Sequence, residues 1–138
     1  MTAVFADTSY WIALTNVQDV DHEKAEAFSA SLKPRPVITT DAVLIEYLNY
    51  FAAWGPRFRR AAGAAVEAME ATGAVHIVPH SDQIFQAGLA LYKARPDKGY
   101  SLTDCISMQT MRREGLTDAL TSDHHFEQEG FRAIFRST

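Results

Sequence analysis

Four acidic residues stand where their carboxylates could act together: Asp7, Glu46, Asp104 and Asp123. Asp7 directly follows the short apolar run at 3–6, and Asp123 follows the run at 119–121 with one serine between them. Ligands of open parallel sheets bind beyond the carboxyl ends of the strands. If both runs are strands of such a sheet, Asp7 and Asp123 lie on the same edge.

The other two acids belong to predicted helices. Glu46 lies about a turn and a half into the helix predicted from Thr40, at the border of its apolar stripe. Asp104 lies in the first turn of a later helix. Four carboxylates in one cleft would repel one another unless hard cations neutralised them, and oxygen-only ligands suit Mg²⁺ or Mn²⁺. If the chain brings the four acids together, the site implies a metal.

Each acid also has a purely structural explanation. Asp7 could cap a helix, and Asp104 could be the acidic member of a capping box that begins at Ser101. Asp123 could be a turn residue or the N-cap of the segment 124–126. Glu46 could simply be solvated at a helix border. Taken singly, no acid establishes a site, so the fold has to decide.

Strand and helix patterns alternate along the chain. Short apolar or β-branched runs predict strands at 3–6, 37–39, 75–78, 119–121 and 133–135. Helical patterns are predicted at 10–17, 22–32, 41–54, 57–72, 82–94 and 102–113. This alternation favours an α/β fold in which helices cover a parallel sheet.

Length and composition limit the possible classes of protein. With 138 residues, 47% of them hydrophobic, the chain is expected to form one domain over 1–138 without intrinsic disorder. A single cysteine, Cys105, cannot form an intramolecular disulfide and is expected to be a small buried residue. No apolar run approaches the ~20 residues that span a bilayer, and no signal-peptide pattern is present, so we expect a cytoplasmic protein without a membrane partner. The net charge of −4 disfavours a sequence-independent coat on nucleic acid.

Four motifs in this order resemble those of PIN-domain ribonucleases, in particular the VapC-type toxins of toxin–antitoxin modules. The similarity extends from Val4 to Phe131, and the motifs are Phe5-Ala6-Asp7-Thr8-Ser9, Ile45-Glu46-Tyr47-Leu48, Ser101-Leu102-Thr103-Asp104-Cys105 and Leu120-Thr121-Ser122-Asp123-His124-His125-Phe126. The resemblance implies a three-layer α/β/α PIN-like fold with a central parallel sheet. It also implies metal ligands and catalytic residues at Asp7, Glu46, Asp104 and Asp123, with hydroxyl neighbours at Thr8, Thr103 and Ser122.

The function implied by this resemblance is that of an endoribonuclease that depends on Mg²⁺, with Mn²⁺ as a possible substitute. Metal-activated water would hydrolyse an RNA phosphodiester and leave a 5′-phosphate and a 3′-hydroxyl. The protein would be the toxin partner of a cognate antitoxin protein. The alternatives are a housekeeping PIN nuclease for RNA processing and a non-catalytic RNA- or protein-binding module. An aspartyl-phosphate enzyme is disfavoured, because Ser9 stands where such phosphatases carry a second acid.

Other residues suggest binding surfaces. The basic residues expected to bind RNA are Lys93, Arg95, Lys98, Arg112 and Arg113, with a second basic cluster at Arg57, Arg59 and Arg60. Aromatic residues are dense between Tyr47 and Phe58, which indicates a homodimer or antitoxin surface. His124 and His125 lack a third nitrogen or thiolate ligand and are expected to be surface or turn residues.

Overall fold

The computed structural model describes residues 2–136 and is built around a five-stranded sheet. The strands are β1 (Val4–Ala6), β2 (Val37–Thr40), β3 (Val75–Val78), β4 (Asp118–Leu120) and β5 (Arg132–Ala133). Their order is β3-β2-β1-β4-β5, and every neighbouring pair is parallel. The parallel sheet expected from the alternating pattern is therefore confirmed.

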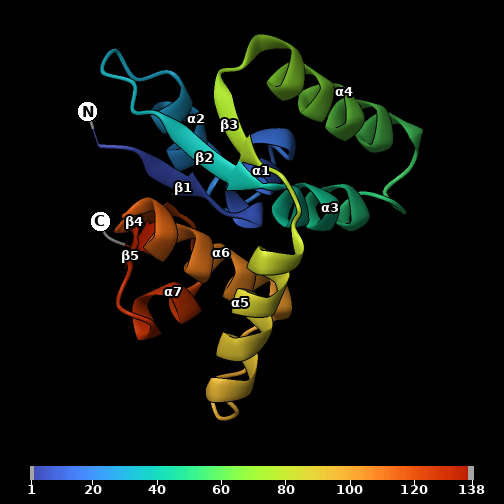
Figure 1. The fold of residues 1–138 in the computed structure, drawn as a ribbon. Helices are drawn as coiled ribbons and strands as arrows, with labels where there is room; N and C mark the ends of the chain where they lie inside the picture. Colours follow the sequence, from blue (N-terminus) through green and yellow to red (C-terminus); the bar gives the residue numbers. More distant parts are fainter. Residues whose placement is uncertain (1, 137–138) are drawn as a thin grey trace.

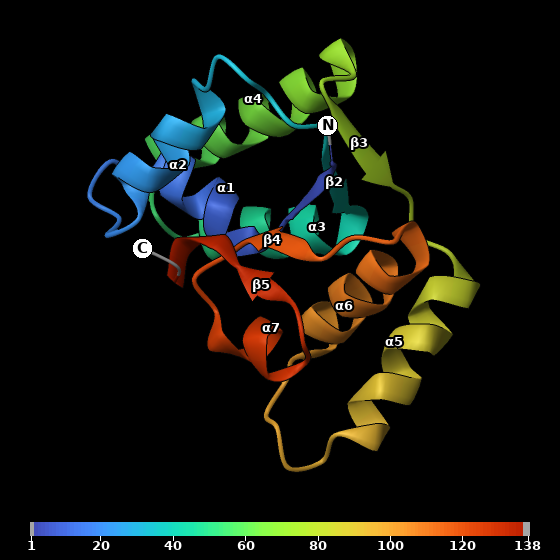
Figure 2. The ribbon, with the colours of Figure 1, turned by 90° about the vertical axis from the view of Figure 1, so that its left-hand side faces the viewer.

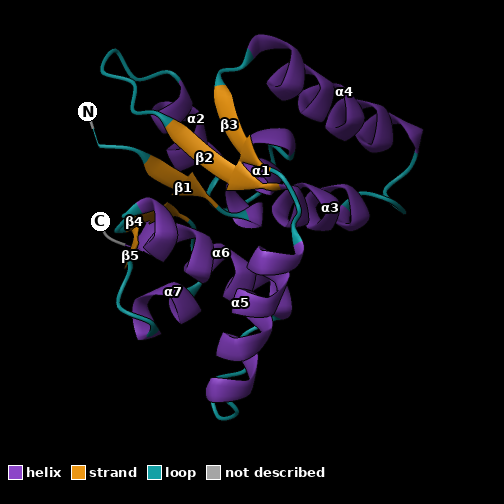
Figure 3. Ribbon diagram, in the orientation of Figure 1, coloured by secondary structure: helices purple, strands orange, loops and turns teal. Residues whose placement is uncertain are grey.

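Helices lie on both sides of this sheet. They are α1 (Thr8–Thr15), α2 (His22–Ser29), α3 (Asp41–Tyr50), α4 (Pro56–Thr72), α5 (Asp82–Ala94), α6 (Leu102–Glu114) and α7 (His124–Gln128), followed by the 3₁₀ turn η1 (Ile134–Arg136). Figures 1 and 2 show α1, α2 and α4 toward one side of the sheet and α5, α6 and α7 toward the other. Coloured by secondary structure, the strands form the middle layer (Figure 3). This is the expected three-layer α/β/α architecture.

Local sequence explains where the site-bearing helices begin and end. The hydroxyl of Thr40 accepts a hydrogen bond from the backbone N–H of Val43 at 3.1 Å and so starts α3 directly after β2. Helix α6 ends at Gly115, whose φ of 71° lies in the left-handed region that glycine adopts without strain. Thr40 thus fixes the start of α3, which carries Glu46, and Gly115 fixes the end of α6, which carries Asp104.

The core lies around β1 and between α5 and α6. All three residues of β1 are fully buried, as expected of the central strand of a covered parallel sheet. Helices α5 and α6 approach closely at Gly88, where an added Cβ would lie 2.5 Å from Cγ1 of Ile106. The absence of a side chain at Gly88 therefore sets the distance between these two helices.

Three sequence-based expectations are corrected by the structure. Helix α2 ends at Ser29, so Leu32 is almost fully exposed, because the chain has already turned into the proline-containing segment before β2. Ala61, which the apolar spacing within 57–72 places on one face with Ala62 and Met69, is exposed, whereas those two residues are buried. The last strand is only Arg132–Ala133, since Phe135 donates its backbone N–H to the Thr121 carbonyl and the chain turns as a 3₁₀ helix. No helix within residues 2–136 has the length and apolar character needed to cross a membrane.

Candidate active site

Asp7 is positioned by the pairing of β1 with β4. Ala6 is in register with Leu120, so the residues that follow these strands meet at the carboxyl edge of the sheet. Asp7 occupies the N-cap position of α1, but its side chain makes no capping hydrogen bond. Instead its Oδ2 accepts a hydrogen bond of 2.7 Å from the hydroxyl of Thr121. The 5% exposed side chain of Asp7 is thus turned toward β4, and helix capping does not explain it.

Thr121 joins the segments that carry two of the acids. Its fully buried hydroxyl donates to Asp7 and accepts hydrogen bonds from the backbone N–H of Asp123 at 3.0 Å and from the hydroxyl of Ser9 at 3.2 Å. One oxygen atom therefore links the end of β1, the start of α1 and the loop after β4. Thr121 and Ser9 belong to the motifs quoted above, but neither was predicted to have a role at the site.

Asp104 is held by the N-terminus of α6. Its backbone N–H donates to the hydroxyl of Ser101, and its Oδ2 accepts from the backbone N–H of Ser101, each at 3.0 Å. The expected capping box is confirmed. The helix end also favours the ionised carboxylate, because the partial positive charge of a helix lies at its N-terminus. Asp104 is only 8% exposed, whereas Glu46 on α3 is half-buried.

Electrostatic coupling shows that the acids lie close together. Burial, opposed by the hydrogen bond from Thr121 and reinforced by the carboxylates of Asp104 and Glu46, raises the pKa of Asp7 to about 7. Burial also raises the pKa of Asp104, and the carboxylates of Asp123 and Glu46 add to this rise. The fold therefore places Asp7 and Asp104 within electrostatic range of each other and of Glu46, and Asp104 within range of Asp123.

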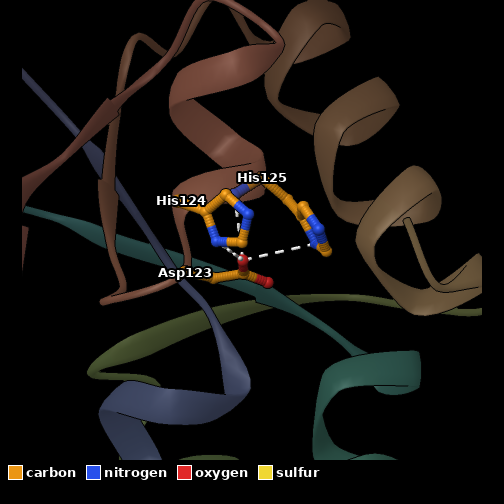
Figure 4. A group of neighbouring side chains, drawn as sticks. All are labelled: Asp123, His124 and His125. Carbon is orange, nitrogen blue, oxygen red and sulfur yellow. Dashed lines mark hydrogen bonds and ion pairs between the residues drawn. The ribbon is translucent and has the colours of Figure 1, made fainter. Parts of the chain in front are cut away.

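His125 lies between two of these acids. Its Nδ1 is 3.3 Å from Oδ1 of Asp123 and 3.6 Å from Oδ2 of Asp104. Asp123 also caps α7, because the same Oδ1 accepts the backbone N–H of His125 at 2.9 Å. Figure 4 shows Asp123 with both neighbouring histidines, whose candidate ligand atoms lie within 4.8 Å of one another. The expectation of a surface residue holds for the exposed His124 but not for His125, which the start of α7 turns toward the acids.

The donor set fits a hard divalent cation. Carboxylate oxygens are the ligands that Mg²⁺ and Mn²⁺ prefer. Within residues 2–136, no lysine or arginine forms an ion pair with any of the four acids, and the basic side chains within ion-pair distance of them are those of His124 and His125. The hydroxyl of Thr8, next to Asp7, is buried without a hydrogen-bond partner. These features are those of a site that a bound cation and its water would complete.

The other predicted site residues are more dispersed. Thr103 and Ser122 are half-buried beside Asp104 and Asp123. Lys93 and Arg113 are exposed, and Lys98 lies 3.7 Å from the exposed carboxylate of Asp97. Their roles in binding RNA stay predictions.

Arg95 and Arg112 differ from the other basic residues. Both contact the buried carboxylate of Glu129, Arg95 through its Nε at 2.9 Å. Glu129 was not identified from the sequence, where it reads as one of several acids in a polar stretch. Cys105 is buried as expected, and burial raises the pKa of its thiol to about 11, so it is no thiolate nucleophile at neutral pH.

Comparison with known proteins agrees with this fold. The family model of the PIN domain matches residues 4–131. The chain therefore belongs to the PIN-domain family.

The relatives are more specific. The chain is 30% identical over 128 residues to the 23S rRNA-specific endonuclease VapC20 of two Mycobacterium tuberculosis strains, CDC 1551 / Oshkosh and H37Rv, covering 93% of this chain and 95% of the relative. The crystal structure of M. tuberculosis VapC20, described as a sarcin-ricin loop cleaving toxin, superposes with a TM-score of 0.83 at 30% identity, with the same coverage of both chains. The protein is thus a VapC-type PIN endoribonuclease toxin, as the motifs indicated. Such a toxin implies an RNA substrate and an antitoxin, and PIN nucleases are typically metal-dependent.

Proposed function

We propose that Asp7, Glu46, Asp104 and Asp123 form the metal-dependent catalytic centre of this endoribonuclease, with Mg²⁺ as its ion and Mn²⁺ as a substitute. The observation that carries the proposal is the meeting of the Asp7 and Asp123 segments at the carboxyl edge of the sheet, where the buried hydroxyl of Thr121 joins them. The raised pKa values of Asp7 and Asp104 support it. Burial is the main cause of both raised pKa values and the neighbouring carboxylates add to it, and a bound divalent cation would favour the ionised form of each acid.

The chain's own residues would orient the reaction. Thr121 fixes Oδ2 of Asp7, and the capping box fixes Oδ2 of Asp104, so both carboxylates are held before substrate arrives. The N-terminus of α6 would favour an RNA phosphate beside Asp104. Thr8, Thr103 and Ser122 are placed to orient carboxylates or water. The bound ion would supply an activated water and stabilise the leaving oxygen, giving 5′-phosphate and 3′-hydroxyl products.

Cleavage of end-labelled RNA tests this proposal. We expect cuts with 5′-phosphate ends in Mg²⁺ or Mn²⁺, loss of these cuts in EDTA, and loss with Asp7→Asn. The matched control is Asp82→Asn, which changes an exposed acid at the start of α5. Products with 2′,3′-cyclic phosphates, or full activity of Asp7→Asn, would contradict the proposal.

We further propose ribosomal RNA as the substrate to test first. The support is the 30% identity across nearly the whole chain to a 23S rRNA-specific endonuclease. Lys93, Lys98 and Arg113 would supply phosphate contacts, because their charges are not held by Glu129. Primer extension on intact ribosomes would locate a single cut, and dispersed cuts at unrelated sites would argue against this substrate.

The partners of the protein are proposed as a cognate antitoxin and a second copy of the chain. The outer face of α3 and the turn after it expose apolar side chains that a monomer would leave in water: Ile45, Leu48, Tyr50 and Trp54. A homodimer would cover them. Light scattering should give the mass of a dimer, and Ile45→Asp should shift it to that of a monomer. A wild-type monomer at the same concentration would refute the homodimer.

A further inference from the structure

Glu129 is a buried carboxylate that joins three segments of the chain. Its side chain is 5% exposed and directly follows α7. Oε1 accepts hydrogen bonds from Nε of Arg95 at 2.9 Å and from the hydroxyl of Tyr100 at 3.1 Å. Oε2 accepts from Arg95 at 3.3 Å and from Arg112. Burial alone would raise the pKa of Glu129, but these hydrogen bonds outweigh it and lower the pKa to about 2.

The partners of Glu129 come from segments that set the position of α6. Arg95 caps the end of α5, Tyr100 directly precedes the N-cap of α6, and Arg112 lies in the last turn of α6. A single carboxylate thus fixes α6 at both its ends relative to α7. Arg95 and Arg112, two of the residues expected to bind RNA, are charge partners of Glu129 in this structure.

A short chain of contacts leads from Glu129 to two of the acids. The ring of Tyr100 packs edge-on against the ring of His125, with centroids 5.2 Å apart. The imidazole of His125 lies between Asp104, which starts α6, and Asp123, which starts α7. Helix α7 has only five residues, with Asp123 at one end and Glu129 at the other. A shift of Glu129 would therefore move Asp123 relative to Asp104.

We propose that Glu129 is a positioning residue for the catalytic centre, setting the spacing between the carboxylates of Asp104 and Asp123. The inference rests on the proposed function of these acids. Glu129 acts through Tyr100 and the two arginines, and touches neither RNA nor the metal. A carboxylate with this role should influence metal affinity as well as stability, because the spacing of the ligands determines how well an ion with a strict coordination geometry is bound.

The test compares Glu129→Gln with Glu127→Gln. Glu127 lies on the same short helix but is exposed and pairs with Arg136, so it is a matched control. Mn²⁺ affinity is measured by calorimetry without RNA, together with kcat, KM and the midpoint of thermal unfolding. We expect Glu129→Gln to weaken Mn²⁺ binding roughly tenfold or more and to lower kcat with KM unchanged, as substitutions that support metal ligands commonly do. Glu127→Gln should leave Mn²⁺ affinity unchanged.

A second variant keeps the test decisive if Glu129→Gln does not fold. Tyr100→Phe removes one hydroxyl, leaves the charges of Glu129 and its arginines in place, and should still weaken Mn²⁺ binding. If Glu129→Gln folds and its Mn²⁺ affinity is unchanged, Glu129 is purely structural and the inference is overturned. If only Tyr100→Phe folds, unchanged Mn²⁺ affinity in that variant overturns the inference in the same way. A raised KM with unchanged kcat and Mn²⁺ affinity would also overturn it, in favour of RNA contact.

The proposed metal centre is judged separately with Asp104→Asn. If this variant binds Mn²⁺ as well as wild type, the metal centre itself is wrong. If Asp104→Asn loses Mn²⁺ but Glu129→Gln does not, only the positioning role is wrong.

Discussion

Replacing Asp7 by asparagine should abolish cleavage and yet stabilise the metal-free protein at alkaline pH. Asp7 has a pKa of about 7 in the folded chain against 3.8 as its ordinary value. The folded state therefore binds a proton that the unfolded chain has released between these two pH values. Stability is lost as pH rises through this window, and asparagine, which carries no charge, avoids the loss.

The size of the effect follows from the two pKa values. A difference of about three pH units corresponds to about 4 kcal/mol of unfolding free energy once Asp7 is fully ionised. About 2–3 kcal/mol of this unfolding free energy is lost between pH 5 and pH 8. Over the same range Glu129, with its pKa near 2, stays ionised and contributes no change. The advantage of Asp7→Asn over wild type should thus grow by about 2–3 kcal/mol from pH 5 to pH 8.

Urea unfolding in EDTA measures this difference. Unfolding free energies are measured for wild type and for Asp7→Asn at pH 5 and at pH 8. Subtracting the wild-type value from that of the variant removes the contribution of histidines that titrate alike in the two proteins. Adding Mn²⁺ at pH 8 should stabilise wild type and leave Asp7→Asn unchanged, because the ionised carboxylate is the form that binds a cation. A difference that stays constant from pH 5 to pH 8 would refute the assignment of the raised pKa to Asp7.

Three further outcomes are expected. Thr121→Val removes the hydroxyl that joins the two sheet-edge segments, and it should lower the unfolding free energy by about 1–3 kcal/mol and reduce cleavage activity. Urea unfolding and cleavage assays measure the two effects. Thr121→Ser keeps a hydroxyl and should retain stability and activity. Gly88→Ala should destabilise the fold by about 1–3 kcal/mol, because its Cβ would overlap the neighbouring helix. Gly63→Ala, whose Cβ meets open space, should instead be neutral or stabilising in thermal unfolding. Cleavage should resist iodoacetamide at pH 7.5, since the thiol of Cys105 is buried and protonated, and rapid inactivation would contradict this.

Much of the fold could be predicted because its signals are local. The strand–helix alternation and the capping box at Asp104 depend on residues close together in the chain. The placement of Asp7 and Asp123 followed from one general property of parallel sheets, that the carboxyl ends of the strands share an edge.

What was missed depends on contacts between distant residues. Thr121 meets Asp7 only because β4 pairs with β1, a choice of neighbour that no local pattern encodes. Glu129 reads as a solvated acid in sequence, since its partners come from residues 95, 100 and 112. Leu32 was misplaced because its spacing continued a helical stripe that the following prolines end.

The strand order β3-β2-β1-β4-β5 has a consequence for the timing of toxicity. The N-terminal strands β1, β2 and β3 and helix α3 bring only Asp7 and Glu46, while Asp104 and Asp123 arrive with α6 and the loop after β4. The hydrogen bond between Asp7 and Thr121 spans 114 positions of the chain. Contacts of such long sequence separation are costly to form early in folding. If the proposed catalytic centre needs all four acids, a partly folded chain that lacks β4 holds an incomplete set, and cleavage would begin only once the last sheet strands have docked.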